Sequence, residues 1–243
     1  MLIINADDLG RSRMETDAAL SCLREGRITS VSAMVFMEDS ERAANLARDC
    51  GVDAGLHLNL SQVFSGRVVS PAVAEAHNRI VGFMKTTKYA LLVYHPFLRR
   101  CFRDVYQTQA DEFVRLFGKS PSHVDGHQHR HLCANMLLDE IIPRGQKVRR
   151  NPSLSPGEKG PLNRAYRRLV DRWLGRRYCL TDYLFNLAEC MEESRLARVL
   201  GLAKVTRVEL ETHPCRKAEH ALLMSDAFGD RLREIRTASY AVL

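Results

Sequence analysis

The sequence opens with Met1-Leu-Ile-Ile-Asn-Ala-Asp-Asp-Leu-Gly10, an apolar run that ends in two aspartates and a glycine. Residues 1–6 have the apolar and β-branched character of a buried strand. Residues 12–25 then place apolar side chains at helical spacing and lead to Gly26, a frequent helix terminator. A buried strand followed by an amphipathic helix is the start of a parallel β–α unit.

The same alternation continues along the chain. Further strands are predicted over residues 30–37, 52–60, 122–126, 146–150 and 204–211. Further helices are predicted over residues 40–50, 96–117, 132–142, 163–174 and 182–200. Loops are predicted over residues 61–76 and 151–161, where Ser, Gly and Pro occur without a clear period. This order predicts an α/β fold of mostly parallel strands, with functional residues at the strands' carboxyl ends.

Size and composition predict one globular domain, because 243 residues with 45% hydrophobic residues can bury a substantial core. The seven cysteines are odd in number, widely spaced and without a C-x-x-C pair, so buried free thiols in a reducing compartment are expected. No signal-peptide pattern opens the sequence, and the longest apolar stretch, residues 89–94, is too short to span a bilayer. We therefore predict a cytoplasmic protein.

Positive charge is concentrated in one segment. The chain has a formal net charge of +7, and residues 143–177 hold eleven Lys and Arg against two acidic residues. Such a segment attracts phosphate groups, anionic lipid or nucleic acid, whereas a solvated arginine-rich helix face explains it equally well. We predict that residues 151–177 form a basic loop and helix inserted into the domain.

Four short stretches hold many of the acids and histidines, and each ends a predicted strand. They are Asn5-Ala-Asp-Asp-Leu-Gly10, Gly55-Leu-His-Leu-Asn59, Asp125-Gly-His-Gln-His-Arg-His131 and Glu209-Leu-Glu-Thr-His-Pro214. A turn at Leu9-Gly10 would bring Asp7 and Asp8 to one rim, although such a pair is also a common helix cap. Taken alone, His57 can equally be explained as a core residue. His213 can equally be explained as a turn residue.

The third stretch gives the strongest signal. With the period of a strand, Asp125, His127, His129 and His131 share one face, so several imidazoles converge at one strand end. Burying so many rings without a metal or carboxylate partners would be costly, and a surface histidine cluster is the alternative. Asp125 is expected to accept a hydrogen bond that fixes one imidazole tautomer.

These residue types predict a divalent metal site. Two histidines and a carboxylate with open positions suit Zn, Fe or Mn and, with more water, Mg. A metal of this kind polarises a carbonyl and lowers the pKa of bound water. An adjacent carboxylate as base and a protonated histidine as acid would complete an amide hydrolysis. Arg149 or Arg150 could orient the base through a bidentate pair.

In their order, and with the third stretch extended to His123, these motifs resemble those of the YdjC-like carbohydrate deacetylase family, which includes chitooligosaccharide deacetylases and hopanoid-associated relatives. The resemblance implies a distorted (β/α) barrel in a single domain. It also implies metal-dependent removal of an acetyl group from an N-acetylated sugar in an oligosaccharide, glycolipid or nucleotide sugar.

Matched residue by residue, the resemblance implies that Asp8, His57 and His127 bind the metal, that Asp7 is the base and that His213 is the acid. Whether His127 or His129 binds the metal stays open. Roles in substrate binding or in supporting the ligands are predicted for His129, His131, Asp125, Arg149, Arg150, Asn59 and Glu209.

The sequence departs from the family pattern at two positions. Cys215 stands where a glycine is expected, and Gln128 stands where some relatives carry histidine. Residues 62–119 and the basic stretch after residue 150 match nothing specific, so substrate choice is expected to reside there.

Two other functions stay open. One is a metal-dependent hydrolase of another bond, a phosphodiester or another linear amide. The other is a non-enzymatic binder of anionic lipid or nucleic acid through the arginine-rich segment. Nucleic acid is disfavoured because few aromatic residues stand between the arginines of that segment. Peripheral contact with the inner membrane face, phosphate contact and a homodimer are all compatible with the sequence.

Overall fold

The computed structural model describes residues 1–66, 69–154 and 158–243. Its centre is one six-stranded sheet with the order β4-β3-β2-β1-β6-β5, in which every neighbouring pair is parallel. The strands are β1 (Leu2–Leu9), β2 (Ser30–Ala33), β3 (Asp53–Leu58), β4 (Val124–Gly126), β5 (Tyr183–Asn186) and β6 (Val208–Thr212). Every residue of β1 and β6 is buried, and the apolar residues of these two strands are interrupted by the buried polar residues Asn5, Asp7, Asp8, Glu209, Glu211 and Thr212.

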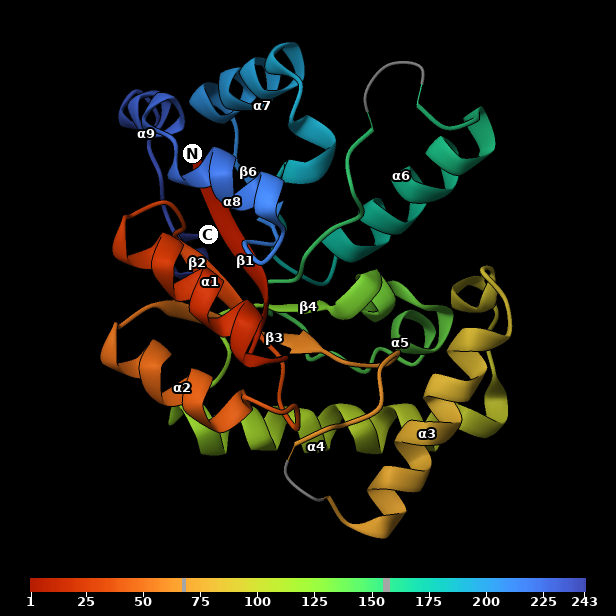
Figure 1. The fold of residues 1–243 in the computed structure, drawn as a ribbon. Coiled ribbons are helices and arrows are strands. Elements are labelled where there is room, and N and C mark those ends of the chain that lie inside the picture. The colour runs from red at the N-terminus through yellow and green to blue at the C-terminus, as the bar shows by residue number, and fades with distance from the viewer. Residues whose placement is uncertain (67–68, 155–157) are drawn as a thin grey trace.

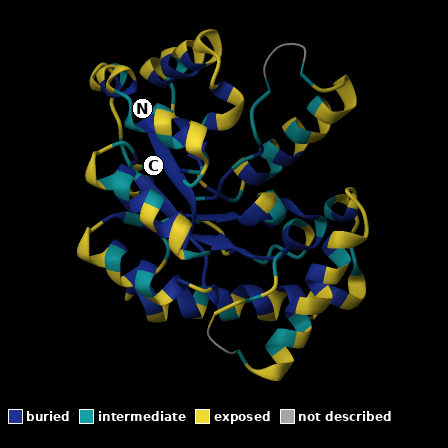
Figure 2. Cartoon of the chain, viewed as in Figure 1, coloured by how far each residue is buried: buried dark blue, intermediate teal, exposed yellow. Residues whose placement is uncertain are grey.

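The helices lie around the outside of this sheet (Figure 1). They are α1 (Arg13–Arg24), α2 (Ser40–Asp49), α3 (Pro71–Thr86), α4 (Arg99–Phe117), α5 (Ala134–Leu138), α6 (Pro161–Gly175), α7 (Glu193–Val205), α8 (Lys217–Met224) and α9 (Asp226–Arg233). Figure 2 shows the strands buried and the helices with buried inner and exposed outer faces, as their amphipathic patterns predict.

The segment that follows α5 curls the sheet into a distorted barrel. Val124 N–H of β4 donates to Lys147 O over 2.9 Å, and Val148 N–H donates to Cys179 O over 3.0 Å. Further along, Ser153 N–H donates to Leu184 O of β5 over 2.8 Å. The segment thus bridges the two edge strands of the sheet, and the predicted single-domain distorted barrel is confirmed. The predicted strand over residues 146–150 is present only as isolated bridges.

Two predicted helices differ from the structure. The predicted helix over residues 182–200 is wrong in its first part, because Tyr183–Asn186 is β5 and the helix α7 begins only at Glu193. Pairing of β5 with β6 at the edge of the sheet outweighs the helical spacing there. The predicted helix over residues 132–142 is shortened to α5.

The predicted loop over residues 61–76 is wrong from residue 71 onward. α3 begins at Pro71, with the Ser70 side chain accepting the hydrogen bond of Val73 N–H. A Ser-Pro pair of this kind is a helix-start signal. Residues 67 and 68 of that loop, and residues 155–157 of the predicted loop over 151–161, lie outside the described residues.

The cysteines are free, as predicted, but they are not all buried. Cys22, Cys101, Cys133 and Cys190 are buried, whereas Cys50 and Cys179 are exposed. In the part of the chain that the structure describes, no helix combines the length and apolarity needed to cross a membrane.

Candidate metal centre

An irregularity in β1 brings both aspartates into the barrel. The register between β1 and β2 shifts between Ala6 and Leu9, and Asp8 takes the left-handed φ of 67°. Aspartate tolerates this conformation better than most residues. On a regular strand the two adjacent side chains would point to opposite faces, but here both are buried at one rim. The expected convergence therefore occurs, and the irregular strand leads into the expected turn at Leu9-Gly10, which Arg11 N–H closes by donating to Asp8 O over 3.0 Å.

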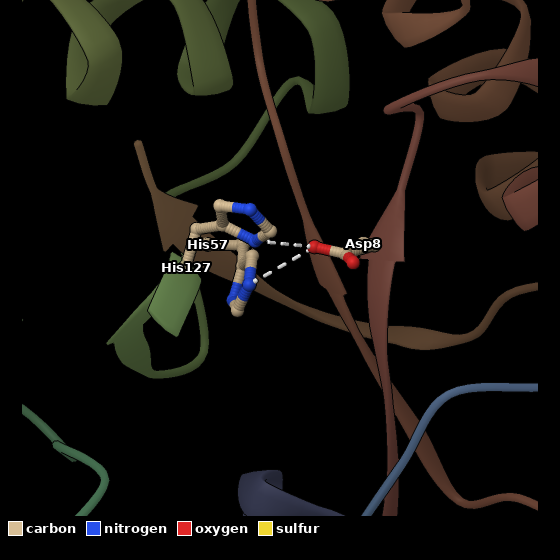
Figure 3. A group of neighbouring side chains, drawn as sticks. All are labelled: Asp8, His57 and His127. Carbon is tan, nitrogen blue, oxygen red and sulfur yellow. Dashed lines mark hydrogen bonds and ion pairs between the residues drawn. The ribbon is translucent and has the colours of Figure 1, made fainter. Parts of the chain in front are cut away.

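Three side chains meet around one carboxylate oxygen (Figure 3). Asp8 Oδ1 lies 3.3 Å from His57 Nε2 and 2.8 Å from His127 Nδ1. Asp8 comes from β1, His57 from β3 and His127 from the first residue after β4. Candidate ligand atoms of all three residues lie within 4.8 Å of one another. The three residues thus form a compact group of the type that holds a divalent metal.

Neighbouring contacts orient these donors as a metal site requires. His57 Nδ1 donates to Asp125 Oδ1 over 2.9 Å, which leaves Nε2 to face Asp8. A carboxylate behind the imidazole is the usual support of a histidine ligand. Arg11 holds the other Asp8 oxygen over 3.2 Å, so Oδ1 is the oxygen turned towards the imidazoles. The donor set and its supports therefore fit a divalent ion.

Arg149, which is fully buried, joins the carboxylates of three strands. Its guanidinium forms a bidentate pair with Asp7 over 2.6 and 2.7 Å and contacts Asp125 and Glu209 at 2.8 Å each. Arg150 points elsewhere and pairs with Asp171 of α6 over 2.7 Å. Of the two arginines considered from the sequence, Arg149 is therefore the one that orients Asp7.

Burial and charge set the protonation of this cluster. Burial acts to raise the pKa of Asp7, but the charges of Arg149 and His57 outweigh it and lower the pKa. Burial raises the pKa of Glu209 to about 7, against the opposing effect of Arg149. Tyr240 donates its hydroxyl to Glu209. Asp7 is thus ionised at neutral pH. Glu209, whose pKa lies close to neutral pH, is partly protonated there.

The predicted alternation along the histidine run is wrong beyond residue 127. β4 ends at Gly126, and both Gln128 and His129 adopt the left-handed φ of 55° in the short 3₁₀ segment His127–Leu132. Because the backbone leaves the strand there, the three histidines do not share a face. His127 turns to Asp8, whereas His131 Nε2 donates to Arg149 O over 2.9 Å.

His129 lies away from the Asp8 group, with Nε2 3.4 Å from Glu211 Oε2. Burial lowers the pKa of His129 to about 3 and that of His131 to about 4. Both rings are therefore neutral at neutral pH. Of His127 and His129, the ring that the structure brings to Asp8 is His127.

Asn59 lies in the loop after β3 and does not reach the metal ligands in the contacts described. Its amide donates to Gln62 O over 2.7 Å, and its side-chain oxygen accepts from Ser61 N–H and Gln62 N–H. The side chain therefore shapes this loop, which leads away from His57.

His213 lies between two buried glutamates that the sequence interpretation missed. Its backbone N–H donates to Glu219 over 2.7 Å, and its Nδ1 is 4.0 Å from the same carboxylate. Its Nε2 is 3.9 Å from Glu211, and groups of Asp7, Glu211 and His213 approach within 4.8 Å. Burial lowers the pKa of His213.

Glu211 brings a second acid to the rim. Burial raises its pKa to about 8, to which the charge of Asp7 adds. Asn186 donates to its Oε1 over 3.1 Å, while its buried Oε2 has no hydrogen-bond partner among the described residues. The alternation of Glu209, Glu211 and His213 along β6 is the signal that could have identified it.

Comparison with known proteins places the chain in a family. A family model described as YdjC-like protein matches residues 1–241. A carbohydrate deacetylase from Mus musculus is 36% identical over 135 residues, which cover 54% of this chain and 43% of the relative. A chitooligosaccharide deacetylase from Proteus mirabilis (strain HI4320) is 32% identical over 133 residues, 54% of this chain and 50% of the relative. The matched region thus spans half of these relatives or less.

The fold has a counterpart among solved structures. A crystal structure from Enterococcus faecalis V583, described as that of a candidate cellobiose-phosphate cleavage protein, superposes with a TM-score of 0.66. The two proteins are 16% identical, and the superposition covers 99% of this chain and 97% of that one. This likeness supports the fold. The family model covers nearly the whole sequence, and on that basis the chain belongs to the YdjC-like family.

Proposed function

We propose that the protein is a metal-dependent hydrolase that removes the acetyl group from an N-acetylated amino sugar. The observation that carries the proposal is the convergence of Asp8, His57 and His127 beside the Asp7–Arg149 pair. The names of the similar deacetylases from mouse and Proteus mirabilis point to the same reaction class. The substrate would be an oligosaccharide, glycolipid or nucleotide sugar.

Asp8, His57 and His127 would hold one divalent ion, Mg or Zn, with Mn or Fe as further candidates. When bound, such an ion polarises the acetyl carbonyl and acidifies water. Asp125 keeps His57 in the tautomer whose Nε2 faces Asp8.

The remaining residues divide the proton transfers between them. Asp7 is ionised, and Arg149 donates to both of its oxygens. Asp7 takes the proton of the attacking water. His213, at the same rim, gives a proton to the sugar nitrogen as the C–N bond breaks. The products are acetate and a free amino sugar. Glu219 lies beside His213 and acts to raise the pKa of the ring, against the larger lowering effect of burial.

Two finer predictions go with this function. The protein is proposed to act in the cytoplasm, and His129, His131 and Glu209 are proposed to support the site rather than to bind metal. The oligomeric state and the choice among sugars would follow from the segments outside the four motifs.

The test is metal-dependent deacetylation by wild-type protein and by Asp8→Asn. Chelator should abolish release of acetate from N-acetylated oligosaccharides, and added Zn or Mg should restore it. Asp8→Asn keeps the size of the side chain but removes the charge that binds the ion. We expect at least a 100-fold loss of kcat/KM and loss of metal binding by titration calorimetry.

Asp17→Asn is the matched control, because Asp17 lies largely exposed on α1 and pairs with Arg42. Its activity should equal that of the wild type. Full activity of Asp8→Asn, or cleavage of phosphodiesters but not of N-acetyl groups by the metal-loaded protein, would refute the proposal.

A further inference from the structure

Helix α6 exposes apolar side chains that nothing in the described structure covers. Of its fifteen residues only Val170 and Leu174 are buried. Leu162 is 86% exposed, Leu169 is 65% exposed and Tyr166 is 38% exposed. Figure 1 shows α6 at the periphery of the molecule, and Figure 2 shows exposed residues along it.

The exposed residues of α6 are arranged in two adjacent rows. Leu162, Tyr166 and Leu169 follow one another at spacings of four and three residues, so they lie on one face of the helix. Arg168 and Arg172 of α6, and Arg176 directly after it, follow at spacings of four beside them and are all exposed. Within residues 1–66, 69–154 and 158–243, none of these three arginines forms an ion pair. An apolar stripe with a neighbouring row of free cations is characteristic of an interfacial helix.

The opposite face of α6 is fixed to the barrel next to the metal centre. Asp171 pairs with Arg150 over 2.7 Å and accepts from Asn151 side-chain and backbone N–H groups over 2.9 and 3.1 Å. Arg167 donates to Pro152 O over 2.8 Å. These contacts lie one to three residues after Arg149, so α6 is attached firmly to the part of the barrel that carries the site.

The composition of the exposed face selects its partner. Leucine side chains gain free energy by leaving water for acyl chains, and arginines beside them pair with lipid phosphates. A nucleic acid backbone would use the arginines but offers nothing to two exposed leucines. In a symmetric contact with a second copy, the arginine rows of both copies would be brought close together and would repel each other.

We propose that α6 docks the protein on an anionic lipid surface, with the apolar stripe inserted at the headgroup boundary and the arginine row on lipid phosphates. The proposal goes beyond the deacetylase function, since docking requires no catalysis. In Figure 1, β3 and β4 point to the side of the molecule from which α5 and α6 extend. Docking would therefore bring the metal centre to a surface that can present a glycolipid substrate.

The test is sedimentation of the full chain with vesicles of phosphatidylglycerol and phosphatidylcholine, compared with pure phosphatidylcholine. Wild-type protein should bind the anionic vesicles and release them as salt is raised. Leu162→Gln/Leu169→Gln and Arg168→Gln/Arg172→Gln should each bind at least 10-fold more weakly. Val205→Gln is the matched control, because Val205 is 81% exposed and lies just before the amino end of β6.

Circular dichroism of each variant shows whether it is folded, and binding is read without reference to activity. The proposal is overturned if wild-type protein fails to bind anionic vesicles, or if the leucine variant binds as tightly as the wild type. It is also overturned if duplex DNA alone is bound, or if the leucine variant turns a wild-type dimer into a monomer on size-exclusion chromatography with light scattering.

Discussion

Arg149 is the residue on which the electrostatics of the site depend. It is the fully buried partner of Asp7, Asp125 and Glu209, and each of these carboxylates comes from a different strand. Carboxylates brought this close in a dry interior would repel one another without a cation between them. The same guanidinium therefore lowers the pKa of Asp7 and links three strands through their side chains.

Replacing Arg149 with methionine should leave these carboxylates buried without their cation. We expect a loss of about 3–5 kcal/mol in the free energy of unfolding, measured by urea denaturation at pH 7.5. Arg207→Met is the control, because Arg207 pairs with Asp182 at the surface and should contribute at most about 1 kcal/mol. Similar losses in both variants would show that the buried ion pairs of Arg149 stabilise the fold no more than a surface pair does.

The residues of the candidate metal site could be predicted because they end strands whose positions were predictable. Asp8, His57 and His127 meet as expected, and the structure selects Arg149 over Arg150. The roles of His129 and His131 could not be predicted. The alternating pattern of the sequence does not indicate that Gln128 and His129 adopt a left-handed backbone and leave the strand. Glu219 was missed because its link to His213 depends on how α8 packs.

At the scale of elements, α3 is tied to the end of β3 by one histidine. His77 Nε2 donates to Asn59 O over 3.0 Å, and its ring stacks on Phe64 with centroids 3.7 Å apart. Burial lowers the pKa of His77 to about 4, against the raising effect of that hydrogen bond. In the unfolded chain the pKa returns to about 6.5.

This difference gives a pH-dependent prediction. Below pH 6.5 His77 is protonated in the unfolded chain, whereas in the folded protein it stays neutral down to about pH 4. The stability that the neutral ring contributes is therefore lost as the pH falls from 6.5 towards 4. His77→Gln removes the titration. The difference in free energy of unfolding between wild type and variant should therefore shrink by about 2 kcal/mol from pH 7.5 to pH 5 in urea titrations. A difference that stays constant with pH would contradict this.

Two glycines give opposite expectations for the same substitution. A Cβ at Gly55 of β3 would lie 2.3 Å from His123 Cε1, and His123 is held by stacking on Tyr240. Gly55→Ala should therefore cost about 1–3 kcal/mol through overpacking. Gly82 is exposed within α3, where a Cβ meets nothing within 4 Å. Gly82→Ala should add about 0.5–1 kcal/mol. Calorimetric melting temperatures that shift in the same direction would contradict this account.

Element boundaries were predictable where local pattern and tertiary pairing agree. α1, α2 and α4 lie close to their predicted ranges because their apolar spacing also faces the sheet. β5 was mistaken for part of a helix, since its four residues form a strand only by pairing with β6. The spacing of apolar residues within residues 183–186 does not indicate that they pair with β6.

At the scale of the whole molecule, the alternation of strands and helices predicted the parallel α/β fold, but it could not predict how the barrel closes. Closure depends on residues 146–153, whose backbone bonds reach β4, Cys179 and β5 without forming a regular strand. Such bonds are set by chain segments far apart in sequence. The family match over residues 1–241 agrees with a single domain built in this way.

Arg149 and Arg150 are consecutive, yet one faces the buried carboxylates inside the barrel and the other faces Asp171 of α6. Attempts to shorten the chain for crystallisation by excising α6 would therefore leave Arg150 without its carboxylate partner, directly beside the arginine that pairs with Asp7. A trimmed version would need a replacement carboxylate at that spot. In the same way, natural homologues that vary the length of this helix would have to change position 150 in step.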